Sequence, residues 1–151
     1  DDEQDAHDLA SQALLQQYPE KDRAELIDDI KAMLANYCAM VEQGLVTTAG
    51  EQEVREWPIQ LRYAGTVWTG IIDRLYKSGD EWVLEDYKTD GKVKPETYHF
   101  QLGLYAHAVE QLLGVTPKVQ LVYVRRSQVV TLDSADLQAA IEEHTQATVA
   151  A

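Results

Sequence analysis

The feature that most constrains this fold is a change in the spacing of apolar residues between residues 44 and 59. Up to residue 43, apolar residues recur every three or four positions, which predicts helices over about 4–17 and 21–43. From residue 59 onward they recur every second position, which is typical of strands. A chain with both patterns can be neither a helical bundle nor an all-β barrel.

The rest of the chain continues to mix the two patterns. Pro95 precedes an apolar stripe of helical spacing, and Asp133 or Ser134 can cap a final helix. The predicted order after the first two helices is three strands (59–63, 66–76, 81–89), a helix (96–113), two strands (119–125, 129–132) and a helix (135–145). This order predicts an α/β fold with a central mixed β-sheet flanked by helices.

The 151 residues suffice for one domain with a substantial core and are too few for two. We therefore interpret residues 1–151 as a single domain. The chain opens at Asp1 without an initiator methionine, so we interpret it as a piece of a longer protein.

The charge is strongly acidic and unevenly distributed. Acidic residues number 26 and basic residues 13, for a net charge of −13, which argues against a free-standing nucleic-acid or anionic-membrane binder. Residues 1–56 carry a net charge of −10, whereas residues 57–151 carry only −3. Any contact with a polyanion is therefore expected in the second part.

A single cysteine limits the possible cofactors. Cys38 alone cannot form an internal disulfide, a zinc site made only of cysteines or an iron–sulfur cluster. We interpret it as a buried thiol in a reducing compartment. There is no apolar run of about 20 residues and no signal-peptide pattern, so we expect a cytoplasmic location without membrane association.

A short turn predicts the register of two strands. If Gly79-Asp80 forms a two-residue type II′ turn, paired positions always sum to 159, and Asp73 lies opposite Asp86. Strict alternation predicts that Asp73 and Asp86 share their face with Ile71, Leu75, Trp82, Leu84 and Lys88. It assigns to the other face Ile72, Arg74, Tyr76, Val83, Glu85 and Tyr87, with Arg74 and Glu85 as an ordinary cross-strand ion pair.

Two adjacent carboxylates on an apolar face are unfavourable unless a cation lies between them. Oxygen ligands suit Mg²⁺ or Mn²⁺. Lys88 lies two residues after Asp86 and hence on the same side of its strand. Two carboxylates and a lysine suit metal-assisted attack of water on a phosphodiester. Asp86 and Lys88 by themselves would favour a solvated ion pair at a strand end.

Three segments together resemble the PD-(D/E)XK nucleases, and more narrowly the RecB/AddA-type nuclease domains of helicase–nucleases. They are Gly70–Leu75, Leu84–Thr89 and Gln101–Ala106. The resemblance implies a restriction-endonuclease-like core that binds Mg²⁺, or alternatively Mn²⁺. It implies that the carboxylates of Asp73 and Asp86 and the backbone carbonyl of Tyr87 bind the metal, and that Lys88 is the catalytic lysine.

The resemblance also implies roles for residues around this centre. Gln101 and Tyr105, one helical turn apart, match the family's Q-x-x-x-Y motif, which contacts DNA or steadies the site. Independently of the resemblance, Lys92 and Lys94 are candidates for DNA contacts, because their loop, which follows Thr89, begins beside the predicted site.

Two further candidates lie upstream. His7, in the segment Ala6–Leu9, matches a family histidine that completes the metal shell, and its alternative is a solvated residue on an acidic terminus. Glu56 resembles a family glutamate that leads into the first strand. It is either a supporting acid or a charge at a strand edge.

We therefore expect a metal-dependent deoxyribonuclease, an exonuclease acting on single-stranded or unwound DNA in repair or recombination. Its partners would be DNA and a helicase, either a domain of the same chain or another subunit. Two alternatives share the fold: a catalytically inactive scaffold or DNA-guiding module of a helicase complex, and a stand-alone nuclease of the CRISPR-adaptation or phage-exonuclease type. The sequence leaves cleavage polarity, the choice between exo- and endonuclease, and oligomeric state open.

Overall fold

The computed structural model describes residues 23–48 and 52–150, the last five of these without their side chains. The helix predicted over 4–17 lies outside the described residues. The described elements are α2 (Arg23–Glu42), β1 (Gln52–Tyr63), β2 (Thr66–Ser78), β3 (Glu81–Lys88), the 3-10 helix η2 (Pro95–Tyr98), α3 (His99–Leu113), β4 (Lys118–Tyr123), β5 (Gln128–Leu132) and α4 (Ser134–Ala150).

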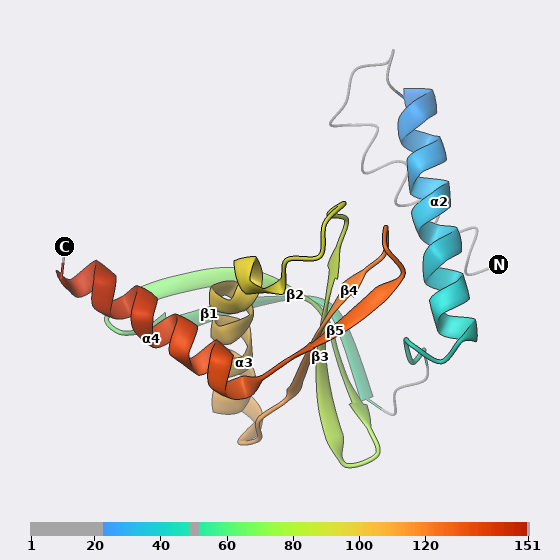
Figure 1. The fold of residues 1–151 in the computed structure, drawn as a ribbon. Coiled ribbons are helices and arrows are strands. Elements are labelled where there is room, and N and C mark those ends of the chain that lie inside the picture. Colours follow the sequence, from blue (N-terminus) through green and yellow to red (C-terminus); the bar gives the residue numbers. More distant parts are fainter. Residues whose placement is uncertain (1–22, 49–51, 151) are drawn as a thin grey trace.

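The five described strands form one mixed sheet in the order β1-β2-β3-β4-β5. Only β3 and β4 run parallel, because η2 and α3 connect them and return the chain to the end of the sheet at which β3 begins. The helices α3 and α4 lie on one side of this sheet and α2 on the other (Figure 1). The predicted α/β fold with a flanked mixed sheet is confirmed.

The predicted register of β2 and β3 is confirmed as far as Arg74↔Glu85, and regular pairing stops one step before the predicted pair of Asp73 and Asp86. The paired positions run from Ser78↔Glu81 to Arg74↔Glu85, and each pair sums to 159. Gly79 has a φ of 61°, whereas Asp80 has no positive φ, which is the pattern of a type II′ turn.

Several element boundaries differ from the prediction: β2 extends to Ser78, β4 ends at Tyr123, and α4 extends to Ala150. β1 begins at Gln52 rather than at residue 59, because it pairs with β2 along nearly the whole length of that strand. A proline at position 58 is compatible with β1 because β1 is an edge strand, and one side of an edge strand has no neighbouring strand that needs a backbone N–H donor. The predicted 96–113 helix begins as the 3-10 turn η2.

The strict alternation predicted for β2 is wrong at Asp73. Ile72 and Leu75 both lie buried in the core beneath α3, whereas Ile71 is 56% exposed. Regular pairing with β1 lapses at this level, between Arg55↔Arg74 and Trp57↔Ile72, where Glu56 has a φ of 49°. The two strands therefore change face at Glu56 and Asp73, so that both halves of β2 pack under α3.

Apolar side chains form clusters on both faces of the sheet. The largest lies under α3 and includes Leu84, Leu102 and Leu121, and a smaller one joins β1, α3 and α4 on the same side. On the opposite face Met40 and Val46 pack against Val122 of β4. Within the described part of the chain, no helix has the length and apolar character needed to cross a membrane. Cys38, predicted to be a buried thiol, is half-buried on α2.

Candidate functional site

Asp73, Asp86 and Lys88 lie where regular pairing between β2 and β3 ends. The last paired position is Arg74↔Glu85, one step before Asp73 and Asp86. Beyond it the Tyr87 amide donates a hydrogen bond of 2.8 Å to Asp73 Oδ2, so this side chain continues the contact between the strands. Asp73 is half-buried, and Asp86 is only 4% exposed.

The ammonium group of Lys88 is held by three side chains. Its Nζ atom lies 2.7 Å from Asp86 Oδ2, donates a 3.2 Å hydrogen bond to Gln101 Oε1, and lies 3.9 Å from the ring centroid of Tyr98. The hydroxyl of Tyr98 in turn donates to Asp90. The cation is therefore fixed by an ion pair, an amide and an aromatic face, which leaves it little rotamer freedom.

Gln101 is itself positioned through Tyr105. The Gln101 amide donates to the Tyr105 hydroxyl at 3.3 Å, and the same hydroxyl accepts the backbone N–H of Ile71 at 3.3 Å. A Cβ atom at Gly70 would lie 2.6 Å from the Tyr105 ring, so a glycine is needed for this ring to rest on the strand. The structure thus links β2, α3 and β3 through the Q-x-x-x-Y residues.

The electrostatics of Asp86 are unfavourable without a further cation. The pKa of Asp86 is raised to about 6, mainly by burial and also by the charge of Asp73, while Lys88 opposes both effects. The buried Asp86 Oδ2 atom forms the ion pair with Lys88 but accepts no hydrogen bond of good geometry. A buried, under-satisfied carboxylate beside a second one fits a divalent cation.

The described residues would supply part of the shell of such a cation. No group of three or more His, Cys, Asp and Glu side chains surrounds a common point in the described ranges. The available donors are therefore the carboxylates of Asp73 and Asp86, with the carbonyl of Tyr87, the residue after Asp86, as a further predicted ligand. The predicted ligand His7 lies outside the described residues.

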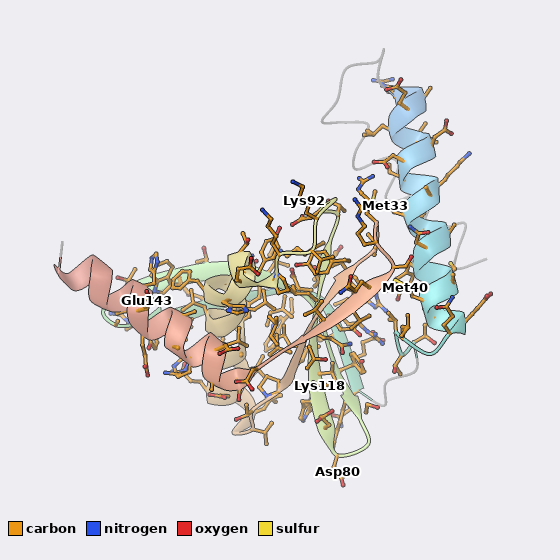
Figure 2. All side chains as sticks on the ribbon, viewed as in Figure 1. Met33, Met40, Asp80, Lys92, Lys118 and Glu143 are labelled. Carbon is orange, nitrogen blue, oxygen red and sulfur yellow. The ribbon has the colours of Figure 1, made fainter. Side chains whose placement is uncertain are left out.

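The other predicted site residues lie around this centre. Glu56 occupies the register position opposite Asp73 and is exposed, as a strand-edge charge would be. Lys92 and Lys94 are exposed on the loop between β3 and η2. Lys92 lies at the opposite end of the sheet from Asp80 (Figure 2). Side-chain hydrogen bonds from the β4–β5 turn hold this loop, since Arg125 donates to Thr89 O and Arg126 to Gly91 O.

Sequence reasoning missed Tyr98 and its partner Asp90. The available signal was spacing, because Tyr98 lies three residues before Gln101, and residues three apart in a helical segment share a face. That signal could indicate a common surface but not the contact between the Tyr98 ring and Lys88.

The interpretation of Arg74 and Glu85 as an ordinary ion pair is wrong. Both side chains are fully buried, with Arg74 Nη1 2.9 Å from Glu85 Oε2. They are covered because α2 and the segment after it pack over this face, which strand periodicity cannot reveal. Glu85 also accepts hydrogen bonds from Tyr76, Tyr87 and Gln120, and Arg74 also pairs with Glu53.

Comparisons with known proteins agree on a family. The family model for the PD-(D/E)XK nuclease superfamily matches residues 1–150. An ATP-dependent helicase/nuclease subunit of Desulforamulus reducens is 40% identical over 60 residues, covering 36% of this chain and 5% of that protein. Its counterpart from Pelotomaculum thermopropionicum is 33% identical over 102 residues, covering 62% of this chain and 8% of that protein.

These matches leave most of the relatives' length unaccounted for, since the chain spans only 5–8% of the two proteins. Among solved structures, a protein of Eubacterium rectale described provisionally as an exonuclease superimposes with a TM-score of 0.61. That alignment covers 82% of this chain and 52% of the other at 14% identity, so it supports the fold alone.

Proposed function

This chain belongs to the PD-(D/E)XK nuclease superfamily, and on that premise we propose that it hydrolyses phosphodiester bonds of DNA with the help of Mg²⁺ or Mn²⁺. The observation that carries the proposal is the under-satisfied Asp86 carboxylate, placed beside Asp73 and Lys88. An ion pair that served only stability would not include a second carboxylate, because the added like charge raises the free energy of the folded protein.

The side chains divide the chemistry between them. Asp73 and Asp86 hold the metal, with His7 and the Tyr87 carbonyl as further ligands. When bound, the metal neutralises phosphate charge and lowers the pKa of a water molecule. Lys88 orients the attacking water and stabilises the charge that develops on the phosphate. Gln101 and Tyr105 position the ammonium group, because they fix one of its three contacts.

The substrate we propose is single-stranded or unwound DNA, degraded as by an exonuclease in repair or recombination. The support for a helicase partner is the similarity to helicase/nuclease subunits. A net charge of −13 gives this domain little intrinsic attraction for DNA. A helicase in the same chain or complex would supply the strand at high effective concentration, in the cytoplasm. Lys92 and Lys94 would then contact phosphates beside the site.

The test is cleavage of end-labelled single-stranded DNA at low salt with Mg²⁺, Mn²⁺ or EDTA. Asp86→Ala and Lys88→Ala should abolish metal-dependent cleavage. Asp80→Asn is the matched control, because this exposed aspartate lies at the other end of the sheet (Figure 2). Cleavage that persists in EDTA or in Asp86→Ala would contradict the proposal. Absence of both cleavage and calorimetric Mg²⁺ binding would favour a non-catalytic scaffold.

A further inference from the structure

A cavity of about 180 Å³ lies beside the candidate site, between α3 and the parts of β1 and β2 near their connecting turn. Its walls include Ile59, Trp68 and Phe100, and Gln101 and Tyr105 also line it. None of the lining side chains is charged. An uncharged cavity with aromatic walls does not suit a phosphate, but it suits a flat, apolar ring with polar edges.

The cavity and the candidate site are neighbours, because two residues belong to both. Gln101 lines the cavity and also accepts the hydrogen bond from Lys88 Nζ, and Tyr105 lines it while holding the Gln101 amide. A ligand group in the cavity would therefore lie next to whatever phosphate Lys88 contacts.

The aromatic walls are already ordered by packing. Trp68 donates from Nε1 to the Tyr63 carbonyl at 3.4 Å, and its ring meets Phe100 edge-on at 5.2 Å. His144 of α4 lies against Phe100, with ring centroids 4.0 Å apart. A preformed aromatic site binds without the free-energy cost of ordering its own side chains.

We propose that this cavity binds one unstacked nucleobase of the strand whose phosphate lies at Asp86 and Lys88. The proposal rests on the proposed nuclease function and adds a substrate-binding subsite to it. The base stacks on one of the Trp68 and Phe100 rings and meets the other edge-on, since their planes are inclined at 75°, and the Thr69 and Gln101 side chains offer hydrogen bonds to its edge. A base inside a duplex is stacked and paired, so this subsite selects single-stranded or unwound DNA.

The test is a set of short fluorescent thymidine oligonucleotides that each carry one abasic residue at a different position. Binding to the full chain is measured by anisotropy at low salt with Ca²⁺, and cleavage is measured separately with Mg²⁺. One abasic position, next to the scissile phosphate, should weaken binding by about 5- to 150-fold, which corresponds to about 1–3 kcal/mol per stacked base. The other positions should change binding far less.

Protein variants locate the effect in the cavity. In Trp68→Leu and Phe100→Leu the loss caused by the critical abasic residue should shrink, whereas Trp68→Phe should retain it because an aromatic face remains. Trp82→Leu is the matched control, a half-buried tryptophan outside this cavity. Thermal melting checks that each variant folds, and the comparison of intact with abasic DNA on the same variant cancels any general loss of affinity.

The outcomes separate the two proposals. Equal losses at every abasic position, or no measurable DNA binding, would overturn the base subsite even if metal-dependent cleavage occurs. A single critical position that depends on Trp68 would support the subsite even if no metal supports cleavage, in which case the proposed nuclease function fails alone.

Discussion

The hairpin of β2 and β3 carries two charged clusters on opposite faces, and they are one residue apart in the sequence. On one face Arg74 and Glu85 form a fully buried pair of opposite charges. On the other, Asp73 and Asp86 bring two like charges together beside Lys88. Burial is not what distinguishes them, because Glu85 is at least as buried as Asp86.

The difference lies in how well the charges are satisfied. Both carboxylate oxygens of Glu85 accept hydrogen bonds. The Arg74 Nη2 atom has no hydrogen-bond partner. The guanidinium group as a whole is nevertheless balanced by two carboxylates and lies 3.9 Å from the Tyr76 ring centroid. Asp86 Oδ2 has an ion pair but no well-aligned hydrogen bond. A balanced network stabilises the fold, whereas an unbalanced one leaves binding capacity for a cation.

The largest expected effect is on stability, from Glu85→Ala. Removing this carboxylate leaves Arg74 buried without its main partner, and loss of one member of a buried ion pair costs about 3–5 kcal/mol. Urea denaturation should show that loss in the free energy of unfolding. If Glu85→Ala destabilised the protein no more than Glu81→Ala, at an exposed position on the same strand, the two faces would not differ as described.

Asp86→Asn should lower activity without lowering stability. It removes a metal ligand, so cleavage should fall by about 10²–10³-fold or more, while stability in EDTA should be equal to or above that of the wild type. Burial raises the pKa of Asp86 to about 6 in the folded state, so the wild type should lose stability as pH rises from about 4 through 6. Melting curves at pH 4.5 and 7.5 measure whether Asp86→Asn removes this loss, and a destabilised variant at pH 7.5 would contradict the interpretation.

Mg²⁺ should stabilise only those proteins that retain both the Asp73 and the Asp86 carboxylates. A ligand at 100 times its Kd raises the free energy of unfolding by about 2.7 kcal/mol. Melting temperatures with Mg²⁺ and with EDTA should therefore differ for wild type and Glu85→Gln, and coincide for Asp86→Asn. An equal shift in all three proteins would place the metal elsewhere.

The smallest expected effect is from Gly70→Ala, which tests the support of Lys88. A Cβ atom 2.6 Å from the Tyr105 ring forces the ring to move, at a cost of about 1–3 kcal/mol for overpacking. Cleavage should decrease because Gln101 moves with Tyr105. Gly91→Ala is the matched control, since a Cβ atom there meets no atom within 4 Å. Unchanged melting and cleavage in Gly70→Ala would show that Tyr105 does not depend on this contact.

Some of these contacts could be predicted from local sequence and others could not. The Gly79-Asp80 turn predicts the register that brings β2 and β3 together at Arg74↔Glu85, and helical spacing predicts that Gln101 and Tyr105 share a face. The exchange of faces at Asp73 could not be predicted, because it depends on the distorted backbone of Glu56 in a neighbouring strand. The contact of Tyr98 with Lys88 depends on how η2 follows the loop after β3.

By itself the sequence determined the order of elements, the β2–β3 register and the residue types available for metal and phosphate chemistry. These depend on turn preferences and hydrophobic period, which act over a few residues. Only the tertiary structure decided which charged cluster finds partners for its carboxylate and which remains under-satisfied, and that an aromatic cavity adjoins the Gln101 side chain that contacts Lys88. The physical reason is that α2 and α3 bring together segments far apart in the chain, and the partners that a buried charge finds there set its free energy.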